Sequence, residues 1–155
     1  MKNQALKVIR LFESGRQERW LEKLKQCDWS AGAFLYDLLH EGAFFETVGE
    51  GSKVLLLTDG DALLSFCTYA KWDDIQPTEL TPWMGFVYTF PEHRGHRYAG
   101  LLLMEVTRLA KEEGRHAVYL STNHIGLYEK YGFEYFGQMP DMANRLSRIY
   151  VKRIP

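Results

Sequence analysis

The sequence predicts an α/β fold in which a mixed sheet carries helices on both faces. One observation is that apolar residues recur at every second position in some segments and at every third or fourth position in others, which indicates strands and amphipathic helices. The other is the order of these segments: one strand, two helices, three strands, a helix, a strand, a helix and two strands. A chain of 155 residues has the length of one domain, so we expect residues 1–155 to form a single domain.

The N-terminal segment predicts a strand followed by two helices. Residues 5–13 alternate loosely between apolar and polar side chains, as a half-buried strand does. Residues 16–27 place apolar side chains three and four positions apart, which is typical of a helix packed on one face. A second helix is expected to begin after a cap at Asp28 or Ser30 and to end before Gly42.

Three strands are predicted next. Residues 53–58 and 62–70 are apolar runs joined by an Asp-Gly dipeptide, which is typical of tight hairpins because the central turn residues take positive φ. Residues 83–90 form the fourth strand. Gly85 within that strand indicates either a β-bulge or a backbone that another group approaches closely.

The C-terminal half begins with a long helix. Apolar side chains between Ala99 and Ala110 follow an i, i+3, i+4, i+7 pattern, and Gly114 is a typical helix stop. The remaining elements are expected to be strands over 117–120, 133–136 and 146–151, and a short helix over 123–131 that ends at Gly132.

Charge and residue types exclude several kinds of site. The 19 Lys and Arg residues nearly balance the 20 Asp and Glu residues, and this net charge of −1 argues against binding nucleic acid by bulk electrostatics. His40, His116 and His124 lack the spacing of metal ligands, so we expect no metal. Cys27 and Cys67 form no C-x-x-C motif; free thiols are favoured, and one disulfide stays open.

Targeting features are absent from the sequence. No apolar run approaches the ~20 residues of a membrane span, and no apolar signal-peptide segment follows the first residues. We therefore expect a cytoplasmic protein with no membrane partner.

The most informative stretch is a strand that feeds a turn of small and basic residues and then a long helix, over 87–100. The first amides of a helix have no partner within it, and the helix dipole places about half a positive charge there. Such a turn suits a phosphate or pyrophosphate. Four side chains add to the local positive charge, namely those of His93, Arg94, His96 and Arg97. The alternative is a tight turn with a solvated basic rim.

Two motifs in this half resemble those of the GNAT superfamily of N-acetyltransferases. The superfamily's R/Q-x-x-G-x-G/A motif is matched by RGHRYA over 94–99, and its V-Y-V-x-P-x-x-R-G lead-in by VYTFPEHRG over 87–95. Its L/F-Y-E-K-L-G-F motif is matched by LYEKYGF over 127–133. The two matches stand in the superfamily's order with one strand between them. The order of elements is also similar, so the resemblance covers nearly the whole chain.

The resemblance implies a GNAT-type, mostly antiparallel sheet and acetyl-coenzyme A bound between the fourth and fifth strands. The backbone of Val87 and Thr89 would hold the pantetheine arm like an added strand, and the amides of residues 95–100 would hold the pyrophosphate. The cofactor-binding residues expected on this basis are Val87, Thr89, Arg94, Gly95, His96, Arg97, Tyr98, Ala99, Gly100 and Asn123. The alternative role for Asn123 is a helix N-cap.

Arg97 departs from the family pattern, because it stands where the motif usually has Gly. A helical φ is compatible with Arg there. We therefore expect its side chain to point outward or alongside the cofactor and to add to cofactor affinity.

For catalysis, the resemblance implies that Tyr128 is the general acid. A phenol with a pKa of about 10 is protonated at neutral pH and can protonate a departing thiolate. The alternative is that Tyr128 packs in the core beside Ile125.

The attacking amine must lose a proton, so a base or a water relay is needed. The candidate carboxylates are Asp73, Asp74 and Glu79, with Glu92 less favoured. In the family fold the loop before the fourth strand would line the acceptor cleft, and its candidate residues are Trp72, Asp73, Asp74, Glu79 and Trp83. The alternatives are solvated loop charges, and tryptophans that cover the end of the core.

The function expected is the transfer of acetyl from acetyl-coenzyme A to a primary amine by direct attack, without a covalent enzyme intermediate. The acceptor, a small molecule or a protein amino group, and the oligomeric state stay open. The runner-up is a non-catalytic acyl-coenzyme A binding module. A nucleic-acid-binding domain is disfavoured by the net charge.

Overall fold

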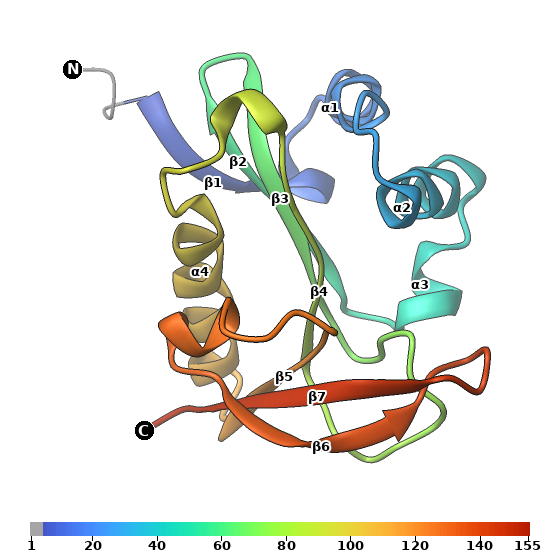
Figure 1. Ribbon diagram of the computed structural model, residues 1–155. Helices are drawn as coiled ribbons and strands as arrows, with labels where there is room; N and C mark the ends of the chain where they lie inside the picture. The colour runs from blue at the N-terminus through green and yellow to red at the C-terminus, as the bar shows by residue number, and fades with distance from the viewer. Residues whose placement is uncertain (1–4) are drawn as a thin grey trace.

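The computed structural model describes residues 5–155 and shows one seven-stranded sheet (Figure 1). Its strands are β1 (Leu6–Arg10), β2 (Lys53–Asp59), β3 (Ala62–Ala70), β4 (Trp83–Thr89), β5 (Ala117–Ser121), β6 (Glu134–Pro140) and β7 (Leu146–Arg153). They lie in the order β1-β2-β3-β4-β5-β7-β6. Neighbouring strands are antiparallel except β4 and β5, which are parallel, so the predicted mixed, mostly antiparallel sheet is confirmed.

Helices cover both faces of this sheet, as predicted. Those within the described residues are α1 (Gln17–Leu24), α2 (Ser30–Glu41), α3 (Phe44–Val48) and α4 (Tyr98–Glu112), together with the 3₁₀ turns η2 (Leu11–Glu13), η3 (Pro91–His93) and η4 (Tyr128–Tyr131). In Figure 1, α4 lies on one side of the central strands, and α1, α2 and α3 lie on the other. Among the described residues, no helix combines the length and apolar character needed to cross a bilayer.

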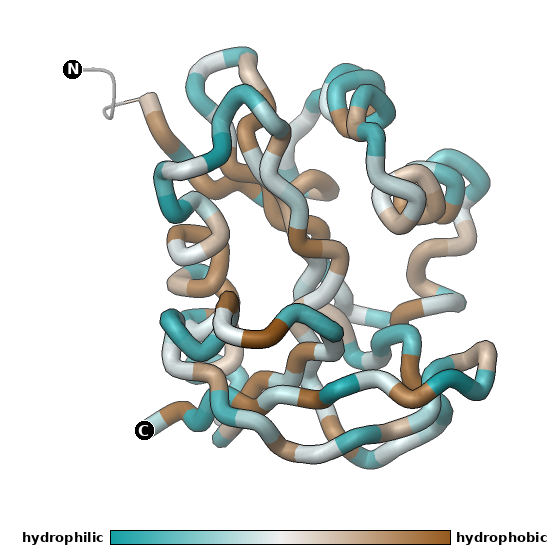
Figure 2. Tube along the Cα trace, in the orientation of Figure 1, coloured by the Kyte–Doolittle hydropathy of each residue, from teal (hydrophilic) through white to brown (hydrophobic). Residues whose placement is uncertain are grey.

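Two apolar cores form because side chains alternate along the central strands. Leu55 and Leu57 of β2 belong to the core beneath α4, whereas Val54 and Leu56 belong to the core beneath α1, α2 and α3. All four are buried, which explains why this strand reads as a continuous apolar run. Figure 2 shows this concentration of hydrophobic residues in the middle strands and a hydrophilic turn before α4.

Three elements differ from the sequence-based expectation. Residues 11–13 form a 3₁₀ turn rather than the end of the first strand. The helix expected over 123–131 is reduced to η4, because Gly126 takes a φ of +91° that no right-handed helix accommodates. The helix α3 was not predicted, since five residues are too few to show a helical period.

The sheet opens between β4 and β5. These strands pair only at Trp83 and Tyr119, where the Tyr119 amide donates to the Pro82 carbonyl at 2.9 Å. Further along, β4 contains a β-bulge in which Phe86 and Val87 stand opposite the single residue Cys67 of β3. Phe86 has a φ of +49°, a conformation uncommon for any residue but Gly. The opening and the bulge lie side by side on β4, and together they shape the cleft described below.

Candidate active site

A cleft of about 1690 Å³ occupies the opening between β4 and β5. Strand β4 divides it into two sides, because Val87 packs toward the core of α4 while Phe86 and Tyr88 pack toward the core of α2. We call these the α4 side and the α2 side. The α4 side is lined by residues 93–95 and 97–99 and by Tyr128, Lys130 and Tyr131 of η4. The α2 side is lined by the start of α2, the β3–β4 loop and the β6–β7 loop.

The turn before α4 presents unpartnered amides, as predicted. Within residues 5–155, the backbone N–H groups of residues 95–99 donate no hydrogen bond, whereas that of Gly100 donates to the Arg97 carbonyl at 3.0 Å. Gly95 (φ +89°) and Arg97 (φ +58°) both take left-handed conformations, which bend the chain sharply into the helix. Free amides at a helix N-terminus suit an anionic group such as a pyrophosphate.

Two arginines flank this turn. The Arg94 Nε donates to the Thr89 carbonyl at 2.8 Å, and its guanidinium lies 5.4 Å from the centre of the Tyr88 ring. The Arg97 guanidinium lies 5.1 Å from the centre of the Tyr131 ring. The expectation of a helical φ at Arg97 was wrong: the backbone there is left-handed, a conformation that Gly adopts more readily than other residues.

The predicted cofactor-binding residues divide into two groups. Seven line the cleft, namely Val87, Thr89, Arg94, Gly95, Arg97, Tyr98 and Ala99. Three lie outside it. His96 is exposed and stacks on Tyr98 at 5.3 Å, and Gly100 leaves room for Tyr131, whose Cε1 would lie only 2.8 Å from an added Cβ. Asn123 accepts the Arg148 amide at 3.4 Å and caps no helix, since η4 begins after Leu127.

Tyr128 lies at the start of η4 and lines the α4 side of the cleft. Its ring is buried and meets Phe133 edge-on at 6.1 Å, whereas Ile125, the alternative packing partner, is 72% exposed. Burial raises the pKa of the Tyr128 phenol to about 12, with smaller contributions from Cys67 and Tyr131. Its hydroxyl makes no hydrogen bond to the described part of the chain. Tyr128 is therefore a protonated donor at neutral pH.

Asp73 is a carboxylate that lies against the backbone of β4 at Gly85. It lines the cleft and rests on Gly85, where an added Cβ would overlap its Oδ1 atom and lie 3.1 Å from Thr68 Oγ1. The close approach predicted at Gly85 is therefore present, with the bulge immediately beside it. Burial raises the pKa of the Asp73 carboxyl to about 7, and the charge of Asp74 adds to this, while a backbone hydrogen bond opposes it.

The other predicted acceptor residues have different surroundings. Trp72 and Asp74 line the cleft and are exposed, and Asp74 accepts the Met142 amide at 3.3 Å. Trp83 lines the cleft but is only 1% exposed, and its indole N–H donates to the Leu80 carbonyl at 2.8 Å. It therefore supports the cleft from within the core. The exposed Glu79, like Glu92 in η3, is not among the lining residues.

Much of the α2 side was not predicted from the sequence. Tyr88 donates to Asp28 at 2.8 Å and stacks on Trp29 at 5.6 Å, and Phe34 lies 6.3 Å from Phe86. The β6–β7 loop adds Asp141, Met142 and Arg145. No local signal marks these residues, because they come from segments far apart in the sequence. Within residues 5–155, no group of three or more His, Cys, Asp or Glu side chains is arranged to hold a metal ion.

The sequence matches a known protein family over most of its length. Residues 10–133 match the family model described as "Acetyltransferase (GNAT) family". An L-methionine sulfoximine/L-methionine sulfone acetyltransferase of Pseudomonas aeruginosa is 27% identical over 126 residues, which span 72% of this chain and 69% of that protein.

Solved structures of acetyltransferases share the fold. A GNAT-family acetyltransferase from Staphylococcus aureus superposes with a TM-score of 0.64 at 14% identity, over 97% of this chain and 100% of that one. An aminoglycoside 6'-N-acetyltransferase complexed with coenzyme A gives a TM-score of 0.66 at 12% identity, over 96% and 97% of the two chains. The chain therefore belongs to the GNAT family of acetyltransferases.

Proposed function

We propose that this protein transfers acetyl from acetyl-coenzyme A to the nitrogen of a primary amine by direct attack, with Asp73 as the base and Tyr128 as the acid. The observation that carries the proposal is that these two side chains line one cleft while belonging to different elements around β4. Donor and acceptor would enter from the α4 side and the α2 side and meet at the β4 bulge.

The α4 side supports binding of the donor. The unpartnered amides of residues 95–99 would hold the pyrophosphate, with Arg97 adding positive charge. The open edge of β4 at Val87 and Thr89 would hold the pantetheine arm. One lone pair of the Thr89 carbonyl is already engaged by Arg94, so the arm would share that oxygen with the guanidinium.

The amine needs help to lose its proton. With a pKa of about 10.4, an alkylamine is only ~0.1% neutral at pH 7.4, a handicap of about 4 kcal/mol. A carboxyl with a pKa near 7 is about half ionised at neutral pH, so Asp73 would accept the proton as the new C–N bond forms.

When the C–S bond breaks, the proton of the Tyr128 hydroxyl would go to the sulfur. A thiol has a pKa of about 8.5, so full transfer from a phenol of pKa about 12 is uphill by roughly 5 kcal/mol. Tyr128 would therefore act first as a hydrogen-bond donor that stabilises the developing thiolate, a contribution of about 1.5–3 kcal/mol.

The proposal is tested by free thiol release from acetyl-coenzyme A in the presence of a panel of primary amines, with the products identified by mass spectrometry. We expect one molecule of thiol for each molecule of N-acetylated amine. Calorimetry that finds no affinity for coenzyme A at millimolar concentration would sink the proposal at its first step. Affinity without thiol release would reassign the chain to acyl-coenzyme A binding alone.

A further inference from the structure

The two sides of the cleft carry opposite charge. The α4 side has the basic residues His93, Arg97 and Lys130, which suit an anionic donor. On the α2 side, the described lining residues include Asp28, Asp73, Asp74 and Asp141, against Arg145 and the guanidinium of Arg94, which lies over the Tyr88 ring. The excess of carboxylates on the α2 side favours a positively charged acceptor.

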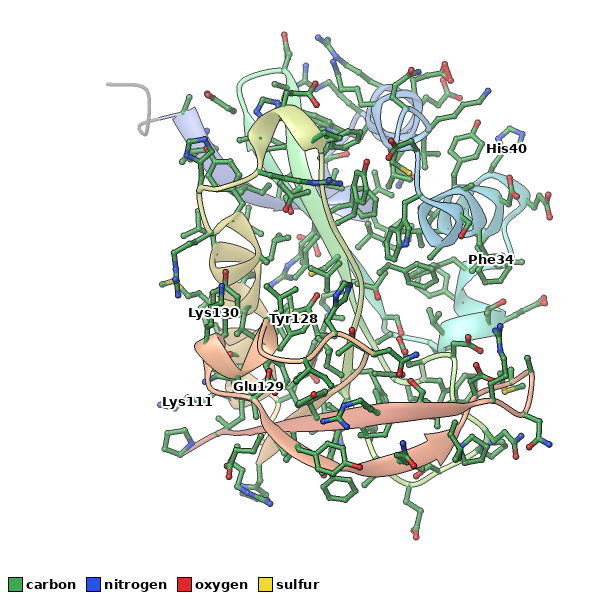
Figure 3. The ribbon with its side chains drawn as sticks, viewed as in Figure 1. Phe34, His40, Lys111, Tyr128, Glu129 and Lys130 are labelled. Atoms are coloured by element: carbon green, nitrogen blue, oxygen red, sulfur yellow. The ribbon has the colours of Figure 1, made fainter. Side chains whose placement is uncertain are left out.

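Large apolar side chains stand exposed on the α2 side. Phe34 of α2, Trp72 of the β3–β4 loop and Met142 of the β6–β7 loop are 50%, 43% and 66% exposed. Each comes from a different segment, yet all three line the same cleft. Exposed apolar side chains gathered in a concave site are typical of a ligand-binding surface. Figure 3 shows Phe34 and Tyr128 on opposite sides of β4.

The charges of the α2 side are unequally available. Within the described residues, Asp73 and Asp74 form no ion pair. The Arg145 Nε already lies 3.3 Å from Asp141 Oδ2. The Lys71 ammonium lies 5.1 Å from the centre of the Trp72 ring, and Lys71 is not a lining residue. A carboxylate on the acceptor would thus face two carboxyl groups without ion pairs, and two arginines that are already engaged, Arg94 with the Thr89 carbonyl and Arg145 with Asp141.

We propose that the acceptor is a primary amine on an apolar body that carries no carboxylate. Phe34, Trp72 and Met142 would cover the apolar body, and Asp74 would attract the ammonium group before Asp73 takes its proton. This inference rests on the proposed amine acetyltransfer. It separates the chain from its Pseudomonas aeruginosa relative, which is named for methionine sulfoximine and methionine sulfone.

The first test compares kcat/KM for 2-phenylethylamine, L-phenylalanine, spermidine and L-methionine sulfone at saturating acetyl-coenzyme A. Phenylethylamine and phenylalanine differ only by the carboxylate, and we expect the amine to be favoured by about tenfold or more, as for one unpaired buried charge contact. Spermidine, a polycation without an apolar body, should be slower than phenylethylamine. A preference for either amino acid, or for spermidine, would overturn the inference and leave amine acetylation intact. If none of the four compounds led to thiol release, both this inference and the proposed amine acetylation would be overturned.

The second test removes the apolar contacts one at a time. Met142→Ala and Phe34→Ala should each raise KM for 2-phenylethylamine by about fivefold and change KM for methylamine, which has no apolar body to cover, much less. Met104→Ala is the matched control, because Met104 is 70% exposed on α4 and lies outside the cleft. Equal effects of the Met142 and Met104 variants, or equal effects on both amines, would contradict the proposal.

Discussion

The replacement of Asp73 by Asn gives the sharpest test of the proposed base. The carboxyl of Asp73 rests on Gly85, and burial raises its pKa to about 7. The ionised form accepts the proton, so activity should rise with pH through this value. With a pKa of about 7, the ionised fraction increases from about 9% at pH 6 to about 91% at pH 8, and kcat/KM should rise about tenfold from this group alone.

The assay is the pH dependence of thiol release for wild type and Asp73→Asn. The ionisation of the amine affects both enzymes equally, so the ratio of their rates isolates Asp73. We expect the variant to be slower by roughly 10²- to 10⁴-fold above pH 8, as for a lost general base, and the ratio to shrink below pH 7. A ratio independent of pH, or a variant with wild-type activity, would refute the assignment of Asp73.

Asp74→Asn is the matched control, because Asp74 is the neighbouring carboxylate and is exposed. Its negative charge helps to raise the pKa of Asp73. In Asp74→Asn the rise of kcat/KM with pH should therefore remain but occur at lower pH. KM for the amine should increase, because one attractive charge is lost. If kcat/KM of this variant no longer rose with pH, the base would be Asp74 instead.

The same pKa predicts how stability depends on pH. The Asp73 pKa in the folded protein, about 7, is above the value of about 3.9 in an unfolded chain, so the folded state binds the extra proton between these values. The free energy of unfolding of the wild type, relative to Asp73→Asn, should therefore fall as pH rises from about 4 through 7. Urea titrations of both proteins across this range measure it; a constant difference would show that the carboxyl is not perturbed.

Three further substitutions test the rest of the site. Tyr128→Phe should fold normally, as circular dichroism checks, and lose turnover by about 10-fold to 10⁴-fold in the thiol-release assay. A lost hydrogen bond to a charged sulfur sets the lower bound, and a lost general acid sets the upper one. Full turnover would assign Tyr128 to packing. Arg97→Gly should relieve a left-handed backbone strain of about 1 kcal/mol. It should also weaken the binding of acetyl-coenzyme A and make that binding less dependent on salt, which calorimetry at two salt concentrations measures. Tighter binding would mean that Arg97 obstructs the phosphates. Gly85→Ala should destabilise the fold by about 1–3 kcal/mol, which thermal unfolding measures, because the added methyl group displaces Asp73. The rise of kcat/KM with pH through 7 should then disappear. A variant with unchanged stability and activity would argue against this close approach.

The parts of the molecule that sequence predicts well are those set by neighbouring residues. The apolar period of α4 and the turn before it lie within one continuous stretch, so the α4 side of the cleft could be predicted from it. The hairpin between β2 and β3 follows from one dipeptide. Gly85 correctly indicated a close approach, although only the structure identifies Asp73 as the approaching group.

The remaining features depend on contacts between distant segments or on backbone conformation. Phe34, Trp72 and Met142 meet only because α2 and two loops converge around β4, and no local pattern records that convergence. The left-handed conformations of Phe86 and Arg97 leave no mark in the sequence, because the residue types that signal positive φ, chiefly Gly, are absent there. For this reason the conformation of Arg97 was predicted incorrectly.

The most direct test of direct acetyl transfer to an amine is a rapid-quench experiment with acetyl-coenzyme A labelled in its acetyl group. Wild-type protein is mixed with the labelled donor, with and without 2-phenylethylamine, and both the intact protein and the small molecules are weighed by mass spectrometry. We predict label on the amine nitrogen, an equal amount of free coenzyme A, no label on the protein at any time, and little product from Asp73→Asn. Label that first appears on the protein and then passes to the amine would contradict direct attack.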